Sequence, residues 1–134
     1  RNFKGNLVGG NLSIICSTIG TPYEIKFNNN ILLVEDVNEN AYAVDRMFSQ
    51  LNSCGKLKKL SGIIIGNFTN CSSTDKTLTI KNIIKEKLTP LNIPIIYGLK
   101  IGHEYPNITI PIGSTFEFST KDNLLIQKEV IFKQ

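Results

Sequence analysis

The chain reads Ile31-Leu32-Leu33-Val34-Glu35 directly after three asparagines, an apolar run of strand length that ends in a carboxylate. Two further apolar runs follow it, one over residues 62–66 and one over residues 93–97. Such runs lack the alternation of a half-exposed strand and are typical of strands covered on both faces. The three runs therefore predict a buried parallel sheet.

A helical pattern separates the first two runs. Between residues 40 and 54, the side chains Val44, Met47, Phe48 and Leu51 recur at the spacing of one helix face. Gly55 follows as a C-cap, because glycine adopts the left-handed conformation that ends many helices. This segment is predicted to be an amphipathic helix.

A second helix is predicted between the second and third runs. Thr74 or Asp75 can cap its N-terminus, and Pro90 stops it. The inner face of this helix would hold Ile80, Ile83, Ile84 and the aliphatic stem of Lys87. Strand, helix, strand, helix, strand in this order argues for two right-handed crossovers and a parallel core.

The segments on either side of this core differ from it. Residues 5–12 are rich in glycine, with a tight backbone turn expected at Gly9-Gly10-Asn11, and residues 12–19 could form a short helix. Residues 107–112, 115–118 and 124–130 are strand-like and are separated by turn-forming residues. The predicted fold class is therefore α/β, a mixed sheet with a parallel βαβαβ core and added C-terminal antiparallel strands.

Composition excludes several classes of protein. Within 134 residues, 41% are hydrophobic and 19% charged, as in one folded domain rather than a disordered tail. The net charge of +4 is mild, and the lysine clusters lack interleaved aromatic residues, so nucleic-acid binding is not expected. No apolar run approaches the ~20 residues of a membrane span, and no signal peptide is visible. We expect no membrane association.

The cysteines argue against a disulfide scaffold or a zinc site. Cys16, Cys54 and Cys71 are odd in number and match no CxxC spacing, which favours a reducing cytoplasm. The one histidine, with nearby carboxylates, lacks the second nitrogen or sulfur ligand that zinc sites usually have. The sequence therefore predicts no metal and no cofactor.

Two side chains could meet at one edge of the predicted sheet. Glu35 ends the first core strand, and the loop after the third contains His103, the only histidine. Loops beyond the carboxyl ends of parallel strands share an edge, so this pair could meet in space. A carboxylate that accepts a hydrogen bond from imidazole Nδ1 prepares Nε2 to take a proton from a nucleophile. Alternatively, His103 is a surface or packing histidine, and Asp36 is a second candidate partner because neighbouring strand residues face opposite ways.

A nucleophile for this pair is missing from the sequence. No Gly-x-Ser-x-Gly elbow occurs, and Ser13, Ser72 and Ser73 have the setting of loop or cap residues. Either the chain is not an enzyme or its nucleophile lies elsewhere.

Five motifs in order nevertheless resemble one family, the C-terminal domains of LD-carboxypeptidases, also called muramoyltetrapeptide carboxypeptidases. The resemblance covers about residues 5–113, and five motifs in register are far more specific than any one alone. The motifs are Gly5-x-Leu7-x-Gly9-Gly10-Asn11-Leu12, Gly20-Thr21-Pro22-Tyr23, Leu33-Val34-Glu35-Asp36-Val37, Asp45-Arg46-Met47 and Gly102-His103-x-x-Pro106-Asn107-x-Thr109-x-Pro111-x-Gly113.

The resemblance implies a function and a partner. It implies that residues 1–134 are the C-terminal domain of a serine peptidase, with Glu35 and His103 as two members of a Ser-Glu-His triad. The serine would lie in an N-terminal domain outside this sequence, so this chain alone should be inert. The implied substrate is the terminal D-alanine of murein tetrapeptides in cytoplasmic cell-wall recycling. The family also implies a barrel-like domain, and homodimer formation and substrate contact by Gly9 and Gly10 are left open.

Three alternatives compete with this interpretation. Related family members are similar to microcin-immunity peptidases, which cleave peptide–nucleotide conjugates. The same scaffold could also serve as a non-catalytic interaction module. Finally, residues 31–40 resemble the first strand of a response-regulator receiver domain, but the strand at 62–66 leads into Asn67 where a phosphoacceptor aspartate is expected.

Overall fold

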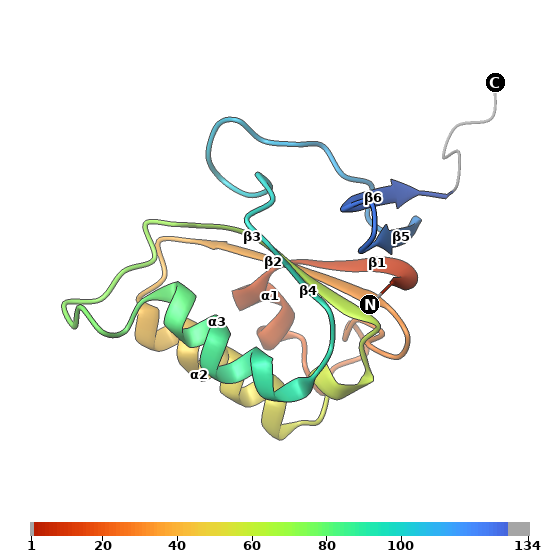
Figure 1. The fold of residues 1–134 in the computed structure, drawn as a ribbon. Helices are drawn as coiled ribbons and strands as arrows, with labels where there is room; N and C mark the ends of the chain where they lie inside the picture. The colour runs from red at the N-terminus through yellow and green to blue at the C-terminus, as the bar shows by residue number, and fades with distance from the viewer. Residues whose placement is uncertain (1, 129–134) are drawn as a thin grey trace.

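Six strands form one mixed sheet in the computed structural model, which describes residues 2–128 (Figure 1). Two single turns of 3-10 helix, Leu57–Lys59 and Thr89–Leu91, follow the second and third helices. The predicted core strands and both predicted helices are present. In chain order the elements are β1 (Phe3–Asn11), α1 (Leu12–Ser17), β2 (Ile31–Val37), α2 (Ala41–Ser53), β3 (Gly62–Thr69), α3 (Ile80–Leu88), β4 (Ile95–Tyr97), β5 (Thr115–Ser119) and β6 (Leu124–Gln127).

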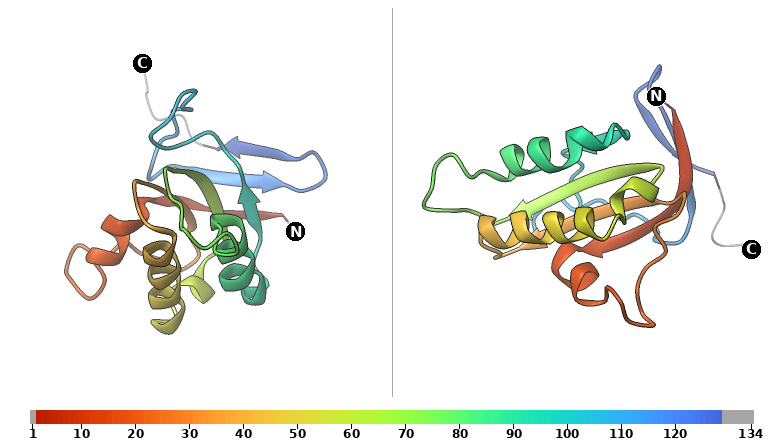
Figure 2. Two further views of the ribbon diagram at one scale, coloured as in Figure 1. Left: turned by 90° about the vertical axis from the view of Figure 1, so that its left-hand side faces the viewer. Right: turned by 90° about the horizontal axis from the view of Figure 1, so that it is seen from below.

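The topology confirms the predicted fold class. The strand order is β4-β3-β2-β1-β5-β6, with β1 to β4 parallel and the C-terminal β5 and β6 antiparallel to their neighbours. All three helices lie on one face of the sheet (Figure 1). The sheet curls into a half-barrel (Figure 2), and β4 and β6 are its two edges within the described residues. The barrel-like shape implied by the family resemblance is therefore only partly closed.

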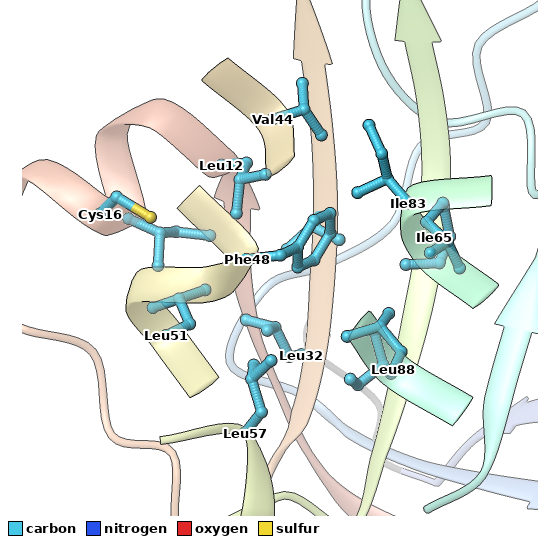
Figure 3. Close-up of a cluster of buried hydrophobic side chains, with 14 of the residues drawn as sticks. Leu12, Cys16, Leu32, Val44, Phe48, Leu51, Leu57, Ile65, Ile83 and Leu88 are labelled. Atoms are coloured by element: carbon cyan, nitrogen blue, oxygen red, sulfur yellow. The ribbon is translucent and has the colours of Figure 1, made fainter. Parts of the chain in front are cut away.

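The larger of two hydrophobic cores lies between the sheet and the helices. Phe48 of α2 sits near its centre, among side chains from β2, β3 and α3 (Figure 3). Leu32 and Val34 of β2 point into this core, and Ile83 of α3 closes it from the other side. Each such side chain contributes roughly 1.5–3 kcal/mol when it leaves water. The helical stripe predicted over residues 40–54 is the face that α2 buries.

The opposite face of the sheet carries the second core. Ile31 and Leu33 alternate with the residues above and point into it. No helix covers this face among the described residues. It is covered instead by Ile101 from the loop between β4 and β5 and by Phe116 from β5. The loop between β4 and β5 is thus packed onto the sheet on the side away from the helices.

β1 lies in the middle of the sheet and was not predicted from the sequence. The interpretation of Gly9-Gly10 as a tight turn is wrong, because both residues pair with β2 inside the strand. Glycine and asparagine have low strand propensity, so the segment does not read as a strand. Gly9 is required by a close approach of two backbones: a Cβ atom there would lie 2.1 Å from the Leu33 carbonyl oxygen.

Three other expectations about elements need correction. The cap of α3 is Thr79, whose side chain accepts from the Asn82 amide, and not Thr74 or Asp75. Residues 107–112 form no strand; they are mostly exposed, Pro106 precedes them and Pro111 lies among them. The last predicted strand is present as β6, although residues 129 and 130 lie outside the described part of the chain. Within residues 2–128, no helix is long and apolar enough to cross a membrane.

Cys16 should make the stability of the fold depend on alkaline pH. Burial between α1 and α2, followed by the nearby Asp36 charge, raises the pKa of this thiol from 9.0 to about 11 (Figure 3). Above pH 9 the unfolded chain releases this proton and the folded chain retains it, so the free energy of unfolding should fall as the pH rises from 9 to 11.

Urea unfolding at pH 8 and pH 10.5 would measure the effect. Other groups titrate in this range, so the test is the difference between Cys16→Ala and Cys54→Ala, the latter removing an exposed thiol. We expect the loss of stability with pH to be smaller in Cys16→Ala. An equal pH dependence in the two variants would show that the Cys16 thiol does not contribute.

Candidate active site

Glu35 is placed at the carboxyl end of β2, on the face of the sheet away from the helices. Two residues earlier, Leu33 points to the same side, as the alternation of a strand requires. The residue is only 7% exposed, and the carboxylate is therefore held in a largely buried position at the strand end. A buried carboxylate requires hydrogen-bond donors, so the chemistry of this edge of the sheet depends on which group donates to Glu35.

That partner is His103, from the loop between β4 and β5. Its Nδ1 atom lies 2.7 Å from Glu35 Oε2, although the two residues are 68 positions apart in the sequence. The histidine side chain remains 50% exposed. The expected meeting of these two side chains at one sheet edge is confirmed.

The hydrogen bond decides which imidazole nitrogen is available for chemistry. An ionised carboxylate only accepts hydrogen bonds, so the proton between Glu35 and His103 belongs to Nδ1. In the neutral ring Nε2 is then an acceptor, on the side of the ring away from Glu35. This geometry suits a general base whose orientation is fixed by a carboxylate.

A bulge in β3 holds the histidine loop in place. The pairing of β2 with β3 skips one residue, because Val34 pairs with Ile65 while Asp36 pairs with Phe68. The Asn67 amide in this bulge donates to the Ile101 carbonyl oxygen at 2.7 Å. The loop is therefore attached to the sheet two residues before His103.

Two glycines make this attachment possible. A Cβ atom at Gly66 would lie 2.4 Å from the Ile101 carbonyl oxygen, so only glycine allows the loop to come this close. Gly102 has a φ angle of 143°, and a Cβ atom there would lie 3.2 Å from Glu35 Oε2. The Gly102 amide also donates to Asn107 Oδ1 at 3.3 Å, which ties the two ends of the turn together.

Asp36, the alternative partner for His103, lies on the helix side of the sheet. Its carboxylate is 2% exposed and accepts from Asn11 Nδ2 at 2.8 Å, from the Ser13 amide at 3.0 Å and from Ser13 Oγ at 2.8 Å. These bonds connect the end of β2 to the start of α1. Asp36 is thus a structural carboxylate, and the described contacts leave Glu35 as the partner of His103.

A cleft of about 390 Å³ opens beside the Glu35–His103 pair. Its polar lining includes Asn107 and its apolar lining includes Ile108 and Ile112. Gly10 borders the cleft, whereas Gly9 is not among the residues that line it. Within the described residues, neither a serine nor a cysteine lines this cleft. Within residues 2–128, no group of three or more histidine, cysteine, aspartate or glutamate side chains could hold a metal ion.

The contacts of several residues that build this site were not predicted from the sequence. Gly66 and Asn67 hold the loop, and Asn107 closes the turn that carries His103. A glycine inside a predicted strand indicates a bulge or a close approach of another backbone, so Gly66 could have been predicted to mark such a position. Nothing local to Asn67 or Asn107 indicates their partners.

Comparison with known proteins identifies relatives across nearly the whole chain. A profile of the family described as LD-carboxypeptidase C-terminal domain matches residues 4–118. A probable murein peptide carboxypeptidase of Bacillus subtilis is 38% identical over 92% of this chain and 39% of its own length. The murein tetrapeptide carboxypeptidase of Pseudomonas aeruginosa is 30% identical over 86% of this chain and 38% of its own length. The chain thus spans about two fifths of these relatives.

Solved structures show the same fold. The muramoyltetrapeptide carboxypeptidase of Oxalobacter formigenes has a TM-score of 0.82 and 31% identity, covering 93% of this chain and 45% of that protein. The microcin C7 self immunity protein MccF has a TM-score of 0.85 and 25% identity, covering 96% of this chain and 39% of that protein.

Proposed function

The chain belongs to the family of LD-carboxypeptidase C-terminal domains, and from this membership we propose that it supplies Glu35 and His103 to a Ser-Glu-His triad. Its relatives are named carboxypeptidases, which supports a peptidase function. The observation that carries the proposal is the 2.7 Å contact between His103 Nδ1 and Glu35 Oε2 at the rim of an open cleft.

In the proposed mechanism His103 acts first as a general base and then as a general acid. Nε2 takes the proton from the serine hydroxyl as the serine oxygen attacks the scissile carbonyl carbon. The carbon–nitrogen bond then breaks, and Nε2 gives that proton to the leaving amine. Water hydrolyses the acyl-enzyme by the same route. Glu35 keeps the imidazole in the required tautomer and stabilises the imidazolium that forms.

The serine is proposed to come from an N-terminal domain of the same polypeptide. Support comes from the length of the relatives, since this chain spans 39% of the Bacillus subtilis protein. The surface around His103 also suits a covering partner: Tyr105 is 97% exposed, and Ile108 and Ile112 are exposed in the same loop. Residues 1–134 alone are therefore expected to be inactive.

The proposed reaction is cleavage of the L,D-peptide bond to the terminal D-alanine of murein tetrapeptides. The names of the Bacillus subtilis and Pseudomonas aeruginosa relatives support this substrate. The likeness to MccF keeps a microcin-immunity type of peptidase as the second candidate. A cytoplasmic location, expected from the cysteines, and a homodimer both stay predictions.

Assays of the full-length protein on two substrates test the function. We expect conversion of a murein tetrapeptide to a tripeptide with release of D-alanine, measured by mass spectrometry. A matched peptide ending in L-alanine should remain intact. Cleavage of a peptidyl–nucleotide conjugate without cleavage of the tetrapeptide would instead support the microcin-immunity candidate. Binding of the murein tetrapeptide without turnover would instead support a non-catalytic interaction module.

A further inference from the structure

A second and larger cleft lies at the opposite end of the sheet from Glu35. Its volume is about 480 Å³, and it contains neither Glu35 nor His103. Asn30 immediately precedes β2 and Lys59 lies shortly before β3, so the cleft sits where the parallel strands begin. The lining residues are Asn6, Glu24, Lys26, Phe27, Asn28, Asn30, Lys56 and Lys59.

Positive charge dominates this cleft. Three lysines face one carboxylate, and Glu24 is paired with Lys56. A hydrogen bond from the Gly20 amide, together with the Lys56 ammonium, lowers the pKa of Glu24 below 4.5, so this carboxylate stays ionised at neutral pH. It neutralises one ammonium group. The ammonium groups of Lys26 and Lys59 form no ion pair with any described residue.

The two lysine-bearing segments are held together by their backbones. The Asn29 amide donates to the Lys59 carbonyl oxygen at 2.8 Å, and the Ser61 amide donates to the Asn30 carbonyl oxygen at 2.9 Å. Asn30 Nδ2 in turn donates to the Lys26 carbonyl oxygen at 2.8 Å. The cleft is therefore formed by a fixed frame, and a ligand would not have to bring its two walls together.

One wall of the cleft is half-buried and polar. The side chains of Lys56 and Glu24 are each about four-fifths buried, at 22% and 21% exposure, and the Lys56 ammonium lies 5.9 Å from the centre of the buried Phe27 ring. This paired wall belongs to the same cleft that the exposed residues Lys26 and Lys59 line. Such a combination of apolar surface and convergent polar groups is typical of small-molecule sites.

We propose that this cleft binds a small phosphate-bearing anion through Lys26 and Lys59. A phosphate group carries up to two charges and several acceptor oxygens, which match two ammonium groups and the Asn28 amide. The cleft falls within the roughly 300–1,000 Å³ of ordinary ligand pockets, so it has room for more than one phosphate. The proposal is independent of the carboxypeptidase function.

Titration of the chain with pyrophosphate, followed by amide NMR at constant ionic strength, tests the site. Saturable shifts are expected at residues 26–30 and 56–61. Lys26→Gln/Lys59→Gln keeps the aliphatic stems and should weaken binding about tenfold or more, because it removes two charge-assisted contacts. The matched control Lys81→Gln/Lys85→Gln makes the same change in net charge on the exposed face of α3 and should bind as the unsubstituted chain does.

Several outcomes would overturn the proposal. Shifts that do not saturate, or that map away from the cleft, would mean that pyrophosphate has no site there. Equal weakening in the two double variants would reduce the effect to net charge. Citrate that binds at least as tightly as pyrophosphate would overturn the assignment to phosphate. If Lys26→Gln/Lys59→Gln lost its folded spectrum, Lys59→Gln alone should still weaken binding several-fold.

Discussion

Replacing His103 by alanine in the full-length protein is expected to lower kcat/KM for release of the terminal residue about 10³-fold or more. In the proposed mechanism, the imidazole carries the proton from the serine to the leaving amine. The same assay should show a loss of about 10³–10⁴-fold for Glu35→Gln. An amide can donate to Nδ1, which would leave the proton on Nε2 and remove the base.

Glu104→Gln is the matched control for these variants. Glu104 is exposed beside His103, and its one described contact is a hydrogen bond from Thr69 Oγ1, which the amide can still accept. Its kcat/KM should stay close to that of the unsubstituted protein. A His103→Ala protein that is folded and retains kcat/KM within about tenfold of this control would refute the catalytic role of the histidine.

The second large effect is expected from Gly66→Ala. The added Cβ atom would lie 2.4 Å from the Ile101 carbonyl oxygen, so the loop must move away from β3. His103 lies two residues further along and would be displaced from Glu35. A shift of about 1 Å in a catalytic group can cost about 100-fold in rate, and we expect a loss of that order in kcat/KM.

A spectroscopic measurement connects this loss to the geometry. The Nδ1 proton of His103 should give a protected NMR signal in the unsubstituted chain, and Gly66→Ala should abolish it. Gly20→Ala is a control variant that strains the backbone without a steric clash. Gly20 has a φ angle of 80°, but no neighbouring atom lies within 4 Å of the added carbon. That control should cost about 1–2 kcal/mol of stability at most and leave the signal unchanged. Survival of the signal in Gly66→Ala would contradict the proposed role of the bulge.

Most of the sheet could be predicted because its elements have local signatures. The apolar run at residues 31–35 and the apolar stripe on α2 can be recognised from their own residues. The spacing of buried side chains follows directly from strand or helix geometry. β1 has no such signature. Gly9 is required by the close approach of β2, a contact made with residues far along the chain.

The amino-acid sequence by itself determined that Glu35 lies near the end of one parallel strand and His103 in the loop after another, and therefore that they share one edge of the sheet. Only the tertiary structure decided between Glu35 and Asp36 as the partner of the histidine. Adjacent strand residues face opposite sides, so the choice depends on which face the histidine loop covers. The bulge at Gly66 and the packing of Ile101 settle that face, and both depend on contacts between segments that are distant in the sequence.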